Sequence, residues 1–241
     1  MKYMGSKNRI AKHILPIMLK ERGNRTWVEP FVGGANMIDK VEGERIGADF
    51  NEYLVSMWVA LQNGWVPPTY VSEEEWAEIR KDDGSIFEKS LIAFVRFGCS
   101  FGADWNGGFA RNVRKNAPDS EYLNRTSKSY CAQSQRNILK QLPKLKGVTF
   151  IHSSYKDLKI PDNSLIYCDP PYENTTGYKD AFNHSDFWQW CREKHTEGHK
   201  VFISGYNAPE DFECVWNMEV STTLNSSKKD IEKLFTFDEL Y

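Results

Sequence analysis

Short apolar runs that alternate with amphipathic segments constrain the fold of this chain more than any other feature. Thr26 to Phe31 is a predicted strand, and the paired glycines Gly33-Gly34 follow it before a predicted helix near 36–41. A second predicted strand, 45–48, ends at Asp49, and Glu52 to Leu61 is a second predicted helix. A strand, a glycine turn, a helix and a strand that ends in an acid are typical of the first half of a nucleotide-binding parallel sheet.

The alternation stops near residue 63 and resumes near residue 146. We predict further helices at 8–19 (bent or shortened by Pro16), 72–81, 87–97, 130–142 and 185–196, a loop at 98–116, and strands at 148–152, 164–168, 200–204, 215–222 and 232–237. The last two strands are expected to close the sheet as antiparallel neighbours. We therefore expect an α/β, Rossmann-like fold with a mostly parallel sheet formed by 1–62 and 146–241, and a helical insertion at 63–145.

A short polar corner follows the apolar run Leu165 to Cys168: Asp169, Pro170, Pro171 and Tyr172. An amino nitrogen on a nucleobase is a poor nucleophile, because its lone pair is delocalised into the ring. The Asp169 carboxylate and the Pro170 carbonyl are two acceptors for its two hydrogens, and the prolines fix the backbone that holds them. Tyr172 is placed to stack on a base rotated out of a duplex. The corner therefore predicts methylation of an exocyclic amino group.

The glycine turn and Asp49 predict a site for a nucleoside. Paired glycines after a strand let the backbone approach a ligand, and an acid at the end of the next strand can accept both ribose hydroxyls. The dinucleotide pattern GxGxxG is absent, which disfavours NAD and favours a single adenosine. A plain structural role stays open for Asp49, as the cap of the helix that follows.

Composition and charge limit the other classes of function. No run approaches the roughly 20 apolar residues that cross a bilayer, and the five scattered cysteines predict a reduced, cytosolic protein without a structural zinc site. The net charge is −2, yet nine basic residues and two acids lie between Arg111 and Lys146, a local charge of +7. Such a stretch suits contact with a polyanion, and a solvated surface is equally compatible with it.

These motifs together resemble the Dam-type (D12 class) DNA adenine-N6 methyltransferases. The resemblance runs nearly end to end, in the order of the family's motifs: 2–7 (KYMGSK), Val28 to Gly34, 47–51 (GADFN), Tyr167 to Tyr172, and the carboxyl-terminal segments 221–227 and 231–234. It implies S-adenosylmethionine as cofactor, DNA as partner, no metal, a monomer or a weak dimer on DNA, and a location in the cytoplasm of a bacterial or phage-infected cell.

The resemblance also implies roles for individual residues. Asp169, Pro170 and Tyr172 would be catalytic, with Asp169 standing where cofactor and target base meet. Predicted cofactor contacts are Tyr3, Lys7, Glu29, Phe31, Gly33, Gly34, Asp49 (ribose), Phe50 (adenine), Tyr155 and Asp169. Predicted DNA contacts in the insertion are Arg96, Trp105, Asn106, Arg111 and Arg114. Trp105 fits packing against the insertion's own helices nearly as well.

Cys99 and Ser100 stand where better-known family members carry a tyrosine and an asparagine that help to fill the vacated base stack. This departure leaves the details of base rotation and any GATC specificity open. Cytosine N4 or an adenine in RNA are alternative acceptors, and a catalytically silent DNA-binding regulator is an alternative of another class. An acid before Pro-Pro favours adenine. The recognition sequence, a preference for hemimethylated DNA, the oligomeric state and the biological role are left open by the sequence.

Overall fold

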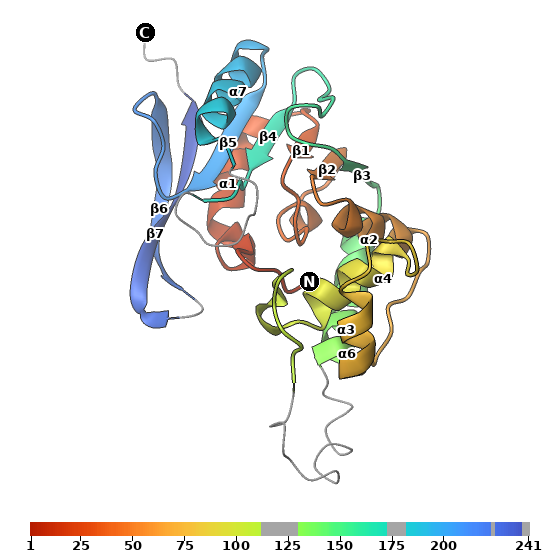
Figure 1. Ribbon diagram of the computed structural model, residues 1–241. Coiled ribbons are helices and arrows are strands. Elements are labelled where there is room, and N and C mark those ends of the chain that lie inside the picture. The colour runs from red at the N-terminus through yellow and green to blue at the C-terminus, as the bar shows by residue number, and fades with distance from the viewer. Residues whose placement is uncertain (112–129, 173–181, 223–224, 238–241) are drawn as a thin grey trace.

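The computed structural model describes residues 1–111, 130–172, 182–222 and 225–237, which form a seven-stranded sheet flanked by helices (Figure 1). The strands are β1 (Trp27–Glu29), β2 (Arg45–Asp49), β3 (Val148–His152), β4 (Leu165–Cys168), β5 (Lys200–Gly205), β6 (Phe212–Thr222) and β7 (Asn225–Phe237). Their order is β3-β2-β1-β4-β5-β7-β6. The first five in this order are parallel, whereas β7 is antiparallel to β5 and β6 is antiparallel to β7. The mostly parallel, Rossmann-like sheet and its antiparallel closing pair are confirmed.

The strand order changes direction between β1 and β4. The chain proceeds from β1 to β2 and β3 on one side, and then returns to place β4 on the other side of β1. In open α/β sheets, ligands bind beyond the carboxyl ends of the strands at such a switch point. The Gly33-Gly34 turn follows β1 and Asp169 follows β4, so both predicted sites lie at this position.

Helices cover both faces of the sheet (Figure 1). The α-helices are α1 (Ala11–Arg22), α2 (Glu52–Gln62), α3 (Glu73–Ile79), α4 (Lys89–Ala93), α6 (Tyr130–Gln141) and α7 (His184–Thr196). Strand alternation sends Trp27 of β1 to one face and Val28 to the other. The Trp27 face packs against α1 and α2, and the Val28 face packs against α7.

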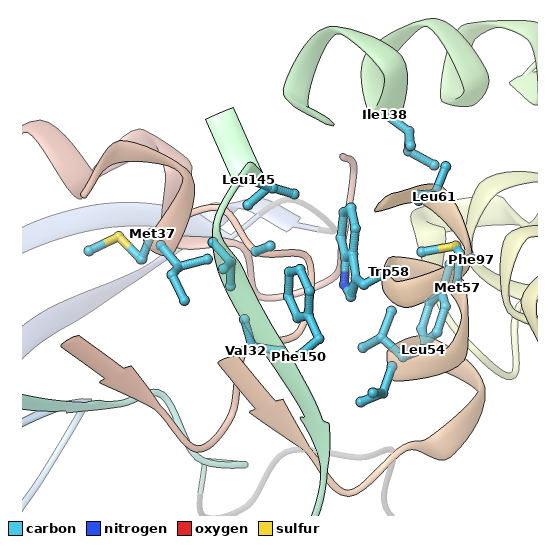
Figure 2. Packing of buried hydrophobic residues seen from close by; sticks show 14 of the residues in the cluster. Val32, Met37, Leu54, Met57, Trp58, Leu61, Phe97, Ile138, Leu145 and Phe150 are labelled. Carbon is cyan, nitrogen blue, oxygen red and sulfur yellow. The ribbon is translucent and has the colours of Figure 1, made fainter. Parts of the chain in front are cut away.

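The helices of the insertion share the core of the Trp27 face. Figure 2 shows Trp58 and Leu61 of α2 between Phe150 of β3 and Ile138 of α6. Trp58 stacks on Phe150 with ring centroids 5.7 Å apart, and all of these side chains are at least nine-tenths buried. Burial of a large apolar side chain stabilises a fold by about 1.5–3 kcal/mol, so this cluster fixes the insertion on the sheet.

Three predicted helices differ from those observed. The predicted helix near 36–41 is wrong: only a 3₁₀ turn, η2 (Ile38–Lys40), forms there. The Ile38 carbonyl accepts from Val41 and from the Arg45 guanidinium, and Val41 is already extended. The first helix begins later than predicted, after the 3₁₀ turn η1 (Lys7–Arg9), and continues through Pro16 to Arg22.

The predicted helix at 87–97 is divided into α4 and a π-helical turn, η3 (Phe94–Gly98). The wider turn directs Phe97 toward the amino-terminal segment, where its ring lies 5.2 Å from that of Tyr3. Two further 3₁₀ turns, η4 (Phe101–Ala103) and η6 (Leu142–Leu145), complete the described elements. In the described part of the chain, every helix is too short or too polar to cross a membrane.

Candidate active site

The amino-terminal segment connects the two predicted sites. The Tyr3 ring lies on the glycine turn, where a Cβ added to Gly33 would meet the ring at 2.8 Å. Ser6 donates its backbone N–H to the Tyr3 carbonyl at 3.2 Å, which closes a turn across Gly5, whose φ is +76°. The chain therefore reverses within four residues and places Lys7 close to Tyr3. The glycines of the turn are required by contact with this protein's own tyrosine.

Lys7 lies against the polar corner formed by Asp169 to Tyr172 at the end of β4. Its Nζ is 3.0 Å from Asp169 Oδ1 and donates to the Gly5 carbonyl at 3.0 Å. The Lys7 side chain is 9% exposed and the Asp169 side chain 22%. Since Tyr3 touches the glycine turn and Lys7 touches Asp169, the turn and the carboxylate belong to one site.

Glu232 of β7 also belongs to this site, although sequence reasoning did not assign it a role. Its Oε1 lies 3.5 Å from Lys7 Nζ and accepts a hydrogen bond from the Tyr172 hydroxyl. The Tyr172 ring lies 4.6 Å from Lys7 Nζ and meets the Tyr206 ring edge-on at 4.7 Å. One sequence signal was available: Glu232 shares the strand face of the buried Leu234 and Thr236.

The site perturbs the titration of all three charged groups. Burial raises the pKa of Asp169, and Lys7 only partly opposes this rise. Burial also raises the pKa of Glu232, with a further rise from the nearby Asp169 carboxylate. Burial alone would lower the pKa of Lys7, but Asp169 and Glu232 outweigh it and raise the pKa. Lys7 is therefore charged at neutral pH.

Asp49 holds the glycine turn in place. Its Oδ2 accepts from the Gly33 N–H at 3.0 Å and its Oδ1 accepts from the Asn51 N–H at 2.9 Å. Burial raises the pKa of Asp49 despite these two hydrogen bonds. The cap of α2 is Asn51, whose side chain accepts from Leu54 N–H at 3.1 Å. The alternative that Asp49 caps this helix is therefore wrong.

The other predicted cofactor contacts lie in three different environments. Phe50, beside Asp49, is 73% exposed, whereas Glu29 is 3% exposed and its Oε1 accepts from the Trp27 indole at 2.8 Å. Phe31 and Tyr155 belong to an aromatic cluster with Phe182 and residues of α7, and their ring centroids are 5.5 Å apart. Glu29 is thus directed into the core of the Trp27 face.

The predicted DNA contacts of the insertion do not form one exposed group. Arg96 donates to the backbone carbonyls of Trp105 and Arg80, both at 3.1 Å, and its guanidinium stacks 3.9 Å from the Trp105 ring centroid. Trp105 also packs against Tyr53 and Phe97.

Two further predicted contacts are more accessible. Asn106 is exposed, and the exposed Arg111 pairs with Glu73 through two hydrogen bonds. Arg114 lies outside the described residues. Across the described residues, no group of three or more potential metal-ligating side chains is found.

Comparisons with known proteins bear on this site. The chain is 26% identical over 197 residues to the modification methylase StsI of Streptococcus sanguinis, a match that covers 74% of this chain and 29% of the relative. The chain thus spans about three-tenths of the length of that relative. The crystal structure of SMU.472 complexed with SAH matches 98% of this chain and 54% of its own, with 10% identity and a TM-score of 0.35.

The family comparison covers most of the molecule. The model of the D12 class N6 adenine-specific DNA methyltransferases matches residues 3–224, a range that includes Tyr3, Lys7, the glycine turn, Asp49 and Asp169. The chain therefore belongs to the D12 class of N6 adenine-specific DNA methyltransferases, a membership that indicates S-adenosylmethionine as its cofactor.

Proposed function

We propose that this protein transfers a methyl group from S-adenosylmethionine to N6 of an adenine that is rotated out of DNA. The observation that carries the proposal is the position of Asp169. Its carboxylate lies at the switch point of the sheet and is fixed by Lys7, whose segment also contacts the glycine turn. The family match over residues 3–224 supports the same acceptor.

The residues at the ends of β1 and β2 fit an adenosine-bearing cofactor. The Asp49 carboxylate has acceptor capacity beyond its two backbone hydrogen bonds, since an ionised carboxylate offers about four lone-pair sites. Phe50 presents a largely exposed ring next to this carboxylate, and an aromatic face of this kind stacks on a purine. Asp49 would hold the ribose and Phe50 the adenine.

The corner at β4 prepares the acceptor nitrogen. When bound, S-adenosylmethionine supplies an electrophilic methyl group on a sulfonium. Asp169 and the Pro170 carbonyl would accept the two amino hydrogens, which concentrates the nitrogen lone pair for attack. Lys7 fixes the Asp169 carboxylate in position through a contact of 3.0 Å. Stacking of Tyr172 on the target base remains part of the proposal.

The partner and biological setting form part of the same proposal. We infer that DNA is held by the insertion, with Asn106 and Arg111 as its accessible predicted contacts, and that the enzyme acts as a monomer or a weak dimer. The name of the relative, a modification methylase, supports a role in restriction and modification. A location in the cytoplasm of a bacterial or phage-infected cell fits a DNA-modifying family.

The test uses purified protein, labelled S-adenosylmethionine and duplex DNA of varied sequence. Mass spectrometry of the nucleosides should identify N6-methyladenine. Detection of N4-methylcytosine instead, or methylation of RNA alone, would show that the acceptor is one of the alternatives. Asp169→Asn should lower kcat about 100-fold or more, because the negative charge that stabilises the positively charged amino nitrogen in the transition state is lost. Asp162→Asn, an exposed aspartate before β4, is the matched control and should leave kcat unchanged. Full activity in Asp169→Asn would contradict the assignment.

A further inference from the structure

Glu232 is a buried carboxylate in the catalytic corner that comes from the far end of the chain. It is 6% exposed, and a carboxylate this buried is stable only when it is paired. Its described partners are Lys7 Nζ at 3.5 Å and the Tyr172 hydroxyl. Both partners are residues that the resemblance already placed at the site.

The contacts of Lys7 show what Glu232 contributes. An ammonium has three donors, and Lys7 Nζ is surrounded by three oxygens: the Gly5 carbonyl and Asp169 Oδ1, each at 3.0 Å, and Glu232 Oε1 at 3.5 Å. Without the third oxygen the ammonium would be drawn toward Asp169, and the Tyr172 hydroxyl would lose its hydrogen bond to Glu232. Glu232 thus fixes both the cation beside Asp169 and the aromatic ring of the corner.

The charges of the corner also support a role for Glu232 in methyl transfer. One ammonium and two carboxylates leave a net charge of −1 when all three are ionised. An amino nitrogen that attacks a methyl group becomes positively charged, and a surplus carboxylate favours this change. With Asp169 alone, the corner would be neutral.

We propose that Glu232 is a positioning residue for methyl transfer, which holds Lys7 and Tyr172 around Asp169 and supplies the second negative charge of the corner. This inference rests on the proposed function. Glu232 in turn contributes to the raised pKa values of two tyrosines of neighbouring elements, Tyr167 within β4 and Tyr206 after β5, in which burial is the largest cause. Lys7 is the cation that the two carboxylates share among the described residues.

Glu232→Gln separates this role from a purely structural one. Glutamine keeps the size and an acceptor oxygen for Tyr172 but removes the charge. The plateau value of kcat should fall about tenfold or more, since a displacement of about 1 Å can cost roughly 100-fold. The acidic limb of the kcat profile should move to lower pH, because Asp169 then has Lys7 to itself and its pKa falls. A structural role alone would lower the melting temperature without moving this limb.

The experiment measures kcat, KM for DNA and the pH profile of wild-type protein, Glu232→Gln and Tyr172→Phe. Tyr172→Phe keeps the ring and removes the hydroxyl, which is hydrogen-bonded to Glu232 and to Asp169. It tests the role of this hydroxyl in the corner should Glu232→Gln fail to fold, and its kcat should fall by a factor of several. Glu213→Gln, an exposed glutamate on β6 of the same hairpin, is the control. If wild-type protein methylates DNA while both variants keep its kcat and acidic limb, the role of Glu232 is refuted and the proposed function stands. If wild-type protein methylates nothing, the proposed function itself fails.

Discussion

The pH dependence of stability that Glu29 should produce is a sharp test of how burial changes the pKa of a carboxyl group in this protein. Its carboxyl is 3% exposed, and burial raises its pKa from an ordinary value of 4.5 to about 8, although the hydrogen bond from Trp27 opposes this rise. Between these two values the folded protein binds a proton that the unfolded chain has lost. The free energy of unfolding should therefore decrease as the pH rises.

The magnitude follows from the two pKa values. One pKa unit corresponds to about 1.36 kcal/mol, so the contribution of Glu29 should lower the free energy of unfolding by about 3.5 kcal/mol between pH 5 and pH 8. Glu29→Gln keeps the acceptor for the Trp27 indole and cannot ionise. It should be the more stable protein at pH 8, with a melting temperature roughly 10 °C above that of the wild type.

Urea unfolding of both proteins from pH 5 to pH 9 measures this difference directly. Subtracting one curve from the other removes the contribution of groups that titrate equally in both. Glu213→Gln, whose side chain is exposed, controls for the loss of a carboxylate as such. Parallel curves for wild-type protein and Glu29→Gln would show that Glu29 does not titrate in this range, and the reasoning would be refuted.

Two further predictions concern the site. Gly33→Ala should destabilise the protein by about 1–3 kcal/mol, because φ is +47° there and the new Cβ would lie 2.8 Å from the Tyr3 ring; an unchanged urea midpoint would contradict this. Phe50→Ala should weaken S-adenosylmethionine binding about tenfold in calorimetry, which corresponds to roughly 1.4 kcal/mol of stacking. Its melting temperature should stay near that of the wild type because the ring is 73% exposed, and unchanged affinity would exclude Phe50 from the site.

Much of the sheet could be predicted from the sequence because its strands are short, apolar and bounded by turn residues. The β2, β3 and β4 strands agree with their predicted ranges within one residue. The absence of the predicted helix at 36–41 could not be foreseen from the sequence. Met37, Ile38 and Val41 have helical spacing, but buried Arg45 binds the Ile38 carbonyl from β2, and only the folded structure shows this contact.

Some residues of the candidate site could be predicted from the sequence and others could not. Asp169 and Asp49 were predicted because each stands at the carboxyl end of a strand, a position that is visible in the sequence. Glu232 was not, because 225 residues separate it from Lys7 in the sequence. Arg96 was predicted to contact DNA because of the resemblance, yet it lies in the turn η3 and is engaged with Trp105 and with two backbone carbonyls. A sequence does not show which arginines the fold itself has already engaged.

The attachment of α6 to the sheet has a consequence for how the proposed DNA specificity could be changed. Gln141 at the end of α6 donates to the carbonyls of Gly34 and Ala35, and Arg45 of β2 donates to the carbonyls of Lys144 and Lys146 just beyond it. Exchanging the whole of residues 63–145 for a foreign segment would thus disturb the backbone of the glycine turn, where we propose that the cofactor binds. Under the proposed role of this segment in DNA recognition, we expect new target sequences to be more accessible through substitutions at 99–111, after η3, which leave these anchors untouched.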